Sequence, residues 1–259
     1  MKIARYTHQD HIAYGVLDGD ELVQLKSDPL FAGYETVNRR IPLADVRLLS
    51  PVIPRSKVVG IGKNYADHAS EMGGEVPAEP LMFFVPNTAV IGPDDPIVLP
   101  EWESEVHHEA ELAVVISRPC RHVPVNRAAE VIFGYTCAND VSARGAQRSD
   151  RTWARAKGFD TSCPLGPFLV VAEEPGEFSP EDAAISARVD GETRQSARTC
   201  EMVYSVAELI SYVSSVCSLL PGDVIMTGTP AGVGPLEAGQ RVEVEIEGIG
   251  TLTNPVVRR

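Results

Sequence analysis

The sequence has few of the features that mark membrane, secreted or nucleic-acid-binding proteins. No apolar run approaches the ~20 residues of a transmembrane helix, and residues 1–6 contain no apolar core of signal-peptide length. Positive charge is also scarce: 23 Lys and Arg stand against 36 Asp and Glu, for a net charge of −13. Such a chain is poorly suited to neutralise phosphates or anionic lipid headgroups. We therefore expect a cytoplasmic protein that binds neither nucleic acid nor a membrane.

The cysteines are too scattered along the sequence to form a structural framework. The five cysteines form no Cys-x-x-Cys pair and have no histidine cluster beside them, which excludes a typical zinc or disulfide framework. Internal repeats and low-complexity segments are absent as well. With 259 residues, 44% of them hydrophobic, the chain is long enough for one medium domain or for a small domain plus a larger one.

Strand-like segments outnumber helical ones and do not alternate regularly with them, which favours an α+β fold over a parallel α/β sheet. The first 50 residues predict a small β unit with a hairpin turn at Asp18-Gly19. A proline-bounded connector at residues 48–54 then predicts a boundary. We expect a small N-terminal β domain over residues 1–54 and a catalytic domain over residues 55–259. The other predicted strands include residues 57–62, 81–84, 89–91, 112–116, 133–140, 165–171, 185–189, 192–196 and 224–227. Asp190-Gly191, between two of them, is a strong signal for a second hairpin.

The clearest predicted helix covers residues 206–219. Ser205 and Glu208 form a capping box before it, an apolar stripe runs along it, and Pro221-Gly222 follows it. A weaker helix is expected at residues 126–132. A polar, arginine-rich stretch runs from residue 142 to residue 157.

Two acids stand on alternate positions just before an apolar run. Glu109 and Glu111 precede residues 112–116, a short β-branched segment typical of a buried strand. Side chains at i and i+2 of a strand share a face, ~7 Å apart, so the two carboxylates repel each other and lose hydration. Solvation at the mouth of a sheet removes this cost, and so does a divalent cation. The segment alone is equally compatible with both.

A third acid, Asp140, ends another apolar strand. Three carboxylates provide only oxygen ligands, which favour Mg²⁺, Mn²⁺ or Ca²⁺ over zinc and copper. An alternative is a non-haem iron site that uses His107 or His108 with a carboxylate. Adjacent histidines on a strand face opposite ways, and no distant histidine obviously pairs with them, so the oxygen-only site is the stronger hypothesis.

His68 and Glu71 are spaced i, i+3 in a short helix-compatible segment, where they are neighbours on one turn. A carboxylate beside an imidazole raises the basicity of the imidazole and fixes its tautomer, which suits the imidazole to act as a general base. An isolated pair of this kind is more often a solvated surface pair. Glycines on both sides, Gly62 and Gly73-Gly74, favour a segment that orders over a bound ligand.

Five cations follow Asp140 in an otherwise acidic chain, and most are expected to balance surface acids. Among them, Lys157 is the candidate partner of a substrate oxyanion. Further along, Thr227-Gly228-Thr229 offers hydroxyls and backbone N–H groups that suit a carboxylate. The same sequence is also typical of a turn that needs glycine only for its backbone geometry.

Five stretches together resemble the fumarylacetoacetate hydrolase superfamily. They are Gly62-Lys63-Asn64-Tyr65-Ala66-Asp67-His68 with Glu71; His108-Glu109-Ala110-Glu111; Asn139-Asp140-Val141-Ser142-Ala143-Arg144 with Gln147; Lys157-Gly158-Phe159-Asp160; and Thr227-Gly228-Thr229-Pro230-Ala231-Gly232-Val233-Gly234. Their order and spacing match over about residues 57–257. The first 50 residues match only as the small N-terminal domain of bacterial members. Each stretch alone is a modest signal, but five in order are highly specific.

The resemblance implies a mixed β-roll of the α+β class with a small N-terminal β domain, usually as a homodimer. It implies a Mg²⁺ or Mn²⁺ site at Glu109, Glu111 and Asp140. It also implies a catalytic dyad of His68 and Glu71, with Lys157 facing the substrate oxyanion. The residues expected around the substrate are Arg144, Gln147, Gly228 and Thr229.

The implied substrate is a small 2-oxo acid or its enol, which chelates the metal and reacts through an enolate. Three outcomes stay open: isomerisation of a 2-hydroxyhepta-2,4-diene-1,7-dioate, decarboxylation, or C–C hydrolysis of an acylpyruvate. Compact two-domain bacterial members are most often described as the isomerase or the decarboxylase. Alternatives of other classes are a catalytically silent protein that binds a metal and an oxo acid, and an Fe(II) oxygenase. One departure is Val85, which stands where many members carry the lysine of a Phe-x-Lys-Pro pattern.

Overall fold

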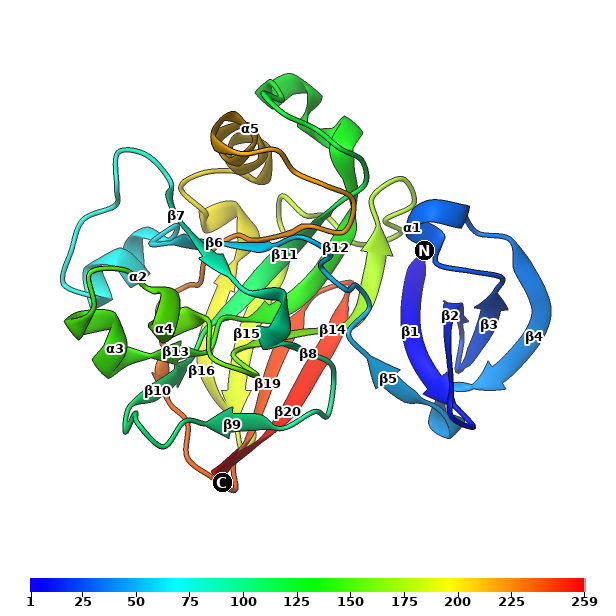
Figure 1. Cartoon of the computed structure of the whole chain (residues 1–259), viewed down its shortest axis with the longest axis horizontal. Helices are drawn as coiled ribbons and strands as arrows, with labels where there is room; N and C mark the ends of the chain where they lie inside the picture. Colours follow the sequence, from blue (N-terminus) through cyan, green and yellow to red (C-terminus); the bar gives the residue numbers. More distant parts are fainter. Residues whose placement is uncertain (259) are drawn as a thin grey trace.

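The computed structural model describes residues 1–258, which form three β-sheets with a few short helices, as expected for the α+β class (Figure 1). The largest sheet has twelve strands. In chain order they are β1 (Lys2–His8), β2 (His11–Asp18), β3 (Glu21–Leu25), β4 (Thr36–Pro42), β5 (Arg47–Leu49), β6 (Val58–Gly62), β7 (Leu81–Val85), β8 (Val90–Ile91), β11 (Ala110–Ile116), β12 (Ile132–Asn139), β14 (Cys163–Val171) and β17 (Val224–Met226). Strands β4 and β5 were not expected from the sequence.

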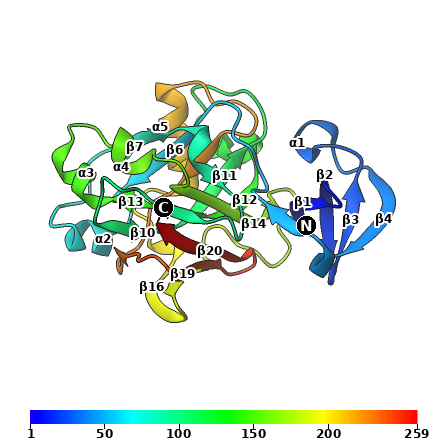
Figure 2. The same cartoon turned by 60° about the horizontal axis from the view of Figure 1, so that its bottom comes forward.

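The N-terminal strands lie to one side of the molecule but continue the large sheet (Figure 2). The order is β4-β3-β2-β1-β14-β12-β11-β17-β6-β7, with β5 paired to β1 and β8 paired to β14. The two parts join where Lys2 and Ile3 of β1 pair with Val170 and Leu169 of β14. The expected boundary at residue 54 falls in the connector between β5 and β6. Because main-chain pairing crosses it, the division into two domains stays a prediction.

Two smaller sheets complete the β structure. A five-stranded sheet has the order β16-β15-β19-β20-β9, and a three-stranded sheet has the order β13-β10-β18. Their strands are β9 (Ile97–Leu99), β10 (Val106–His108), β13 (Ser142–Ala143), β15 (Ala184–Val189), β16 (Glu192–Arg198), β18 (Gly234–Pro235), β19 (Arg241–Ile246) and β20 (Gly250–Arg258). The hairpin predicted at Asp190-Gly191 is confirmed, since it joins β15 to β16.

Strand β11 is buried on both faces, which explains its unbroken apolar sequence. Leu112 and Val114 belong to a core cluster shared with the five-stranded sheet. Ala113 and Val115 belong to a second cluster on the opposite face, together with residues of β6, β14 and β17. Because side chains alternate along a strand, Glu111 projects to the same face as Ala113. The carboxylate is therefore held at one end of the second core cluster.

The long helix α5 (Val206–Val216) is three residues shorter than predicted. Its capping box is present, because Ser205 and Glu208 satisfy each other's backbone N–H groups. Cys217 is extended rather than helical, and Leu219 exchanges backbone hydrogen bonds of 2.9 Å with Cys120. This pairing ends the helix before Pro221-Gly222, so Val216 is 53% exposed rather than part of the buried stripe.

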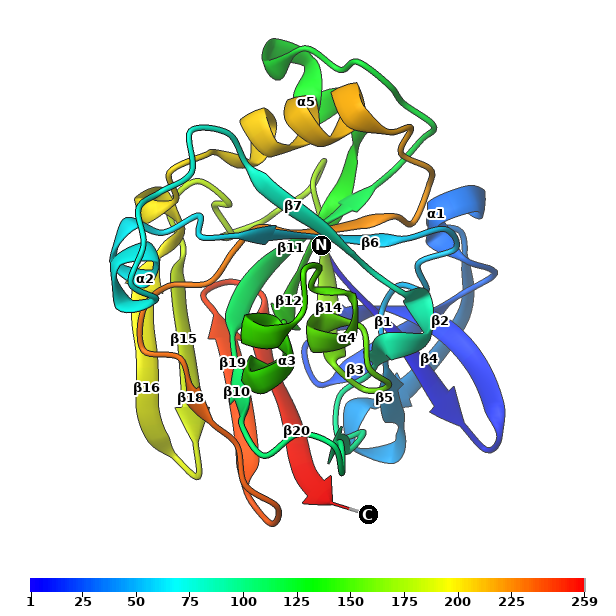
Figure 3. The ribbon, with the colours of Figure 1, turned by 60° about the vertical axis from the view of Figure 1, so that its left-hand side comes forward.

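The remaining helices are short. They are α1 (Pro29–Ala32), α2 (Ala66–Glu71), α3 (Arg144–Ser149) and α4 (Ala154–Lys157), with 3₁₀ turns η1 (Leu43–Asp45), η2 (Asn87–Ala89), η3 (Val125–Val131) and η4 (Thr199–Glu201). The weak helix expected at residues 126–132 is thus a 3₁₀ segment. Helices α3 and α4 form within the arginine-rich stretch and pack against each other and against β13. In Figure 3 they lie in front of β12 and β14. Among residues 1–258, no helix is both long and apolar enough to cross a membrane.

Candidate metal and substrate site

Three buried carboxylates meet where two antiparallel strands end. Glu109 lies between β10 and β11, Glu111 lies in β11, and Asp140 directly follows β12. Main-chain contacts fix this junction, because the Asp140 N–H donates to the Glu109 carbonyl at 2.9 Å. One oxygen from each carboxylate lies within 4.8 Å of the others, and the three residues are 4%, 1% and 1% exposed. The solvated alternative is therefore wrong: these acids are buried together.

The electrostatics of the cluster suit a divalent cation. Burial, followed by repulsion from Asp140 and Glu109, raises the pKa of Glu111 well above its usual value. Burial also raises the pKa of Asp140 to about 7. The Asp140 Oδ1 atom is buried without a hydrogen-bond partner in the described part of the chain. Three hard oxygen ligands with an unsatisfied acceptor fit a divalent metal of the Mg²⁺ or Mn²⁺ type.

Two cations approach the carboxylates from the arginine-rich stretch. Lys157, at the end of α4, donates from Nζ to Glu109 Oε2 at 2.7 Å and to Asp140 Oδ2 at 2.6 Å. Arg144, at the start of α3, places its guanidinium 2.7 Å from Glu109 Oε1. Burial opposes ionisation of Glu109, but the two cations outweigh it and hold the pKa of this carboxyl well below its usual range. Arg144 and Lys157 are both 2% exposed, so neither is one of the surface cations expected for most of this stretch.

The pair on α2 is in direct contact. His68 Nδ1 lies 3.1 Å from Glu71 Oε2, and His68 is 5% exposed. The glycine-rich loop after β17 also holds Glu71, because the Gly232 N–H donates to Oε1 at 3.0 Å. Gly232 is required there: its φ is +99°, and a Cβ atom would lie 2.1 Å from the Arg194 carbonyl oxygen. The pair is thus anchored to the body of the protein.

A cavity of about 190 Å³ connects these groups. Its lining contains His68, two of the three carboxylates and four cationic side chains. The residues that line it are Ile61, Gly62, Lys63, His68, Met72, Glu109, Glu111, Arg144, Gln147, Arg148, Trp153, Lys157 and Thr229. All of the predicted catalytic, metal and substrate residues except Asp140, Glu71 and Gly228 therefore face one small space. Two of them, Arg144 and Gln147, are hydrogen-bonded to each other at 2.7 Å.

Gly228 lies beside the cavity lining rather than in it. Its N–H donates to Glu111 Oε2 at 2.7 Å, so it holds a carboxylate of the cluster. The next residue, Thr229, lines the cavity, and its hydroxyl oxygen accepts a hydrogen bond from Gln195 at 2.7 Å. Sequence reasoning missed Gln195, which lies in β16 outside every recognised stretch and is completely buried.

The two adjacent histidines point to different partners. His107 Nε2 lies 3.3 Å from Glu105, while His108 Nδ1 lies 3.0 Å from Gln195 Oε1. Within residues 1–258 the one cluster with metal-ligand geometry consists of carboxylates alone. This arrangement disfavours the iron site that was considered for His107 or His108.

Val85 is a core residue in this fold. It lies in β7 opposite Val58, is 1% exposed, and does not line the cavity. Lys63, the residue directly after β6, has a φ of +58° and contributes a cation to the cavity lining. Residue 85 therefore brings no charge to the cavity, whereas Lys63 places one on its wall.

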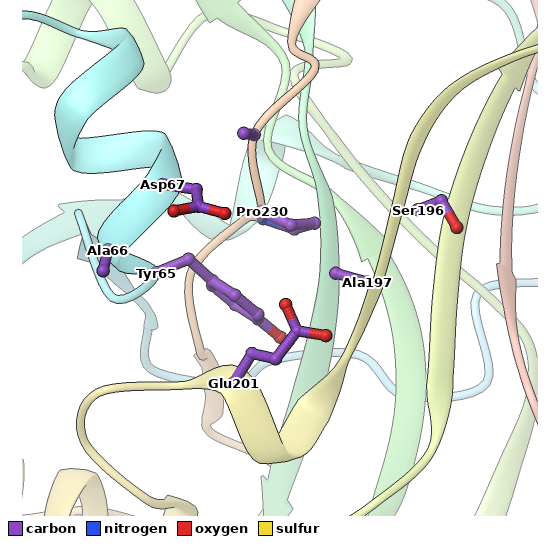
Figure 4. A pocket seen from close by; sticks show the side chains of 8 residues that line it. Tyr65, Ala66, Asp67, Ser196, Ala197, Glu201 and Pro230 are labelled. Atoms are coloured by element: carbon purple, nitrogen blue, oxygen red, sulfur yellow. The ribbon is translucent and has the colours of Figure 1, made fainter.

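A second hollow, of about 160 Å³, lies next to α2 (Figure 4). Asp67 and Glu201 border it together with the ring of Tyr65. Among residues 1–258, none of those predicted for catalysis or metal binding lines this hollow. It shares only the Pro230-Ala231 segment with the loop that anchors Glu71, so we place the functional site in the first cavity.

A comparison with protein-family models agrees with this site. The model described as "Fumarylacetoacetate (FAA) hydrolase C-terminal" matches residues 57–257, which carry all of these groups. The chain belongs to the fumarylacetoacetate hydrolase family. A second model, "Rv2993c-like, N-terminal", matches residues 1–51. Both the family and the α+β fold expected from the sequence are confirmed.

Relatives of this chain carry several different names. A 5-carboxymethyl-2-hydroxymuconate delta-isomerase from Mycobacterium smegmatis is 48% identical with a TM-score of 0.91, and each chain is covered completely. Oxaloacetate tautomerase FAHD2A of Bos taurus is 43% identical over 84% of this chain and 71% of its own length. A fumarylpyruvate hydrolase from Pseudomonas aeruginosa, solved with Mn²⁺ and pyruvate, is 36% identical with a TM-score of 0.75, over 82% of this chain and 92% of its own.

Proposed function

We propose that this family member is a Mg²⁺- or Mn²⁺-dependent enzyme that acts on small 2-oxo or enol (di)carboxylates. The lead reaction is isomerisation of a 2-hydroxyhepta-2,4-diene-1,7-dioate or decarboxylation of a 2-oxo acid. The observation that carries the proposal is the buried cluster of Glu109, Glu111 and Asp140, faced by cationic side chains in one cavity. An acidic protein binds a small anion best where a metal and a few cations offset its overall charge.

Glu109, Glu111 and Asp140 would hold the metal, which when bound acts as a Lewis acid toward substrate oxygens. Lys157 and Arg144 supply positive charge beside the position of those oxygens, because both already lie 2.6–2.7 Å from carboxylate oxygens of the cluster. Positive charge fixed in a buried site stabilises negative charge that develops on the substrate. Gln147 and Thr229 add neutral polar contacts to the same cavity.

His68 would transfer a proton at the edge of the cavity. Its Nδ1 atom contacts Glu71, so Nε2 is the ring nitrogen left for the substrate or for a water molecule. Glu71 orients the imidazole and stabilises its protonated form, while Gly232 fixes Glu71. This arrangement suits a proton shift between carbon atoms as well as the activation of water.

The second candidate function is C–C hydrolysis of an acylpyruvate, and the His68–Glu71 contact favours it. The names of the isomerase and hydrolase relatives support both candidates, and the oxaloacetate tautomerase adds keto–enol interconversion of a 2-oxo diacid. All of these reactions remove or add a proton beside an oxo group. The same cationic cavity therefore serves each of them.

A substrate panel tests the proposal. The protein would be incubated with Mg²⁺ or Mn²⁺ and an acylpyruvate, oxaloacetate or a 2-hydroxy-diene-dioate, with products read by mass and keto–enol exchange read by absorbance. We expect turnover of at least one substrate and its loss on metal chelation. No turnover with oxalate still binding would instead favour a catalytically silent binding protein. Oxygen consumption that requires iron would favour an oxygenase.

A further inference from the structure

Gln195 is a completely buried amide that joins two segments of the site. It lies in β16, and its side chain contacts groups on the β10–β11 junction and on the loop after β17. Its Oε1 atom lies 2.9 Å from the Ala110 N atom and 3.0 Å from His108 Nδ1. Its Nε2 atom lies 2.7 Å from both Thr229 Oγ1 and the Pro230 carbonyl oxygen. All the hydrogen-bonding capacity of the amide is thus used.

Two of these partners fix the direction of the other two hydrogen bonds. The Ala110 N–H is only a donor, so the atom that faces it must be the amide oxygen. The Pro230 carbonyl is only an acceptor, so the atom that faces it must be the amide nitrogen. It follows that the Thr229 hydroxyl oxygen accepts from Gln195 and that His108 donates from Nδ1 to Gln195.

This direction determines what Thr229 offers to the cavity. Because the hydroxyl oxygen accepts from Gln195, its own proton is free to be donated elsewhere. No acceptor for that proton occurs among the hydrogen bonds of residues 1–258, and Thr229 lines the cavity. A hydroxyl that presents a proton to a cationic cavity selects an anionic or carbonyl oxygen.

We propose that Gln195 is a positioning residue that holds Thr229 as a hydrogen-bond donor to a carboxylate oxygen of the substrate. It also ties the Thr229 loop to the strand junction that bears Glu109. The carboxylate ligand rests on the proposed function, but the hydrogen-bond direction does not. The site therefore recognises its substrate through a neutral donor of fixed polarity in addition to its cations.

The test is the affinity of the folded protein for oxalate in Mg²⁺, measured by isothermal titration calorimetry. Gln195→Glu keeps the oxygen that accepts from Ala110 but replaces the donor, so the Thr229 proton turns toward the introduced carboxylate. We expect ~10- to 100-fold weaker oxalate binding, as for the loss of a hydrogen bond to a charged group. Thr229→Val should weaken binding similarly, whereas Thr229→Ser, which retains the hydroxyl, should restore it.

The decisive measurement is the double variant. If Gln195 acts through Thr229, then Gln195→Glu should weaken binding little further once Thr229→Val is present. Equal, additive losses in both backgrounds would overturn the inference and leave Gln195 a purely structural residue. Gln240→Glu is the matched control, because the Gln240 oxygen likewise accepts from a backbone N–H, at Glu237, but on the surface.

Failure of the proposed function gives a different result. In that case the wild-type protein would bind no oxalate and turn over no substrate of the panel, and the carboxylate part of the inference would fall with it. Hydrogen exchange tests separately whether Gln195 holds the β10–β11 junction and the loop after β17 together. We expect the amides of Ala110 and of residues 228–232 to exchange faster together in Gln195→Glu but not in Gln240→Glu. Unchanged exchange in a fully folded Gln195→Glu protein would contradict the tie.

Discussion

Individual carboxylates in the site have different neighbours and therefore different roles. Glu109 is paired with two buried cations, whereas Glu111 has, among residues 1–258, only the Gly228 N–H as a hydrogen-bond partner. Removing Glu109 would leave Arg144 and Lys157 buried with less compensation, at a cost of several kcal/mol. Glu111 is therefore the better position at which to separate metal binding from folding.

Glu111→Gln should abolish metal binding and turnover while the protein stays folded. The substitution keeps the shape and an oxygen that accepts from Gly228, but removes the negative charge that a divalent cation requires. We expect Mn²⁺ affinity, measured by electron paramagnetic resonance, to fall by more than the ~10- to 100-fold typical of outer contacts. Glu237→Ala, at an exposed position, is the control. Wild-type Mn²⁺ affinity in Glu111→Gln would remove this carboxylate from the site.

His68→Ala should lower the rate of the chemical step on a hydrolysed acylpyruvate by ~10²- to 10⁴-fold, the usual contribution of a general base. The substitution removes the imidazole that Glu71 orients and leaves the carboxylate cluster intact. Steady-state kcat and KM report the effect, with Mn²⁺ affinity as a check that the metal site persists. His11→Ala, on the exposed start of β2, is the control. Unchanged hydrolysis would exclude the dyad from the mechanism.

We expect His108 to make the stability of the protein depend on pH. Burial lowers the pKa of this imidazole from 6.5 to about 4. Above pH 6.5 both folded and unfolded states are neutral there; as pH falls toward 4, only the unfolded state takes up the proton. Protonation of His108 in the unfolded state should therefore lower the free energy of unfolding by up to about 3 kcal/mol between pH 6.5 and pH 4.

His108→Asn removes the titrating group while keeping a donor for Gln195. The measurement is urea unfolding at several pH values between 4 and 7, at constant metal concentration. The free energy of unfolding should fall less steeply with acidification in the variant than in the wild type. Parallel slopes for the two proteins would show that His108 does not carry this dependence.

Helix α5 illustrates how local signals and tertiary contacts share control of one element. Its start follows the capping box of Ser205 and Glu208, which involves only neighbouring residues. Its end follows the pairing of Leu219 with Cys120, about a hundred residues away in the chain. The N-terminal boundary was therefore predictable from the sequence, and the C-terminal one was not.

Ser205→Ala should destabilise the protein by about 1 kcal/mol, the typical value of an N-cap side chain. The variant loses the oxygen that accepts from the Glu208 N–H, while Glu208 keeps its contact with the Ser205 backbone. Thermal or urea unfolding measures the change. Ser215→Ala, an exposed serine near the other end of α5, should stay within about 0.5 kcal/mol of the wild type. Equal effects of the two substitutions would contradict a capping role.

At the scale of the whole molecule, β1 joins the N-terminal strands to the rest of the large sheet, and the proposed catalytic groups lie in the part of the chain that follows. The family relationship predicts a homodimer, and several large apolar side chains stand exposed on the N-terminal part. They include Ile12, Phe31 and Val37, at 61%, 52% and 45% exposure. Light scattering after gel filtration should give twice the 28.0 kDa of one chain at micromolar concentration. A mass of one chain across that range would contradict the dimer.

The sequence by itself determined the features that depend on neighbours a few residues apart. Alternation and apolar runs predicted most strands, and turn residues predicted the hairpins at Asp18-Gly19 and Asp190-Gly191. The spacing of Glu109 with Glu111 and of His68 with Glu71 indicated paired side chains. These patterns are readable because strand and helix periods bring such residues together whatever the rest of the chain does. The five ordered stretches then indicated the family.

Only the tertiary structure decided which charges face each other and which are buried. Lys157 meets Asp140 because α4 folds back over the strand ends, and Gln195 meets Thr229 because β16 passes beside a loop 34 residues later in the chain. No local pattern marks such contacts, since they depend on strand pairing between distant segments. The same is true of Val85, whose burial in the core follows from its pairing with Val58. Burial of the acids raises their electrostatic energy, and that energy is what suits the site to a metal.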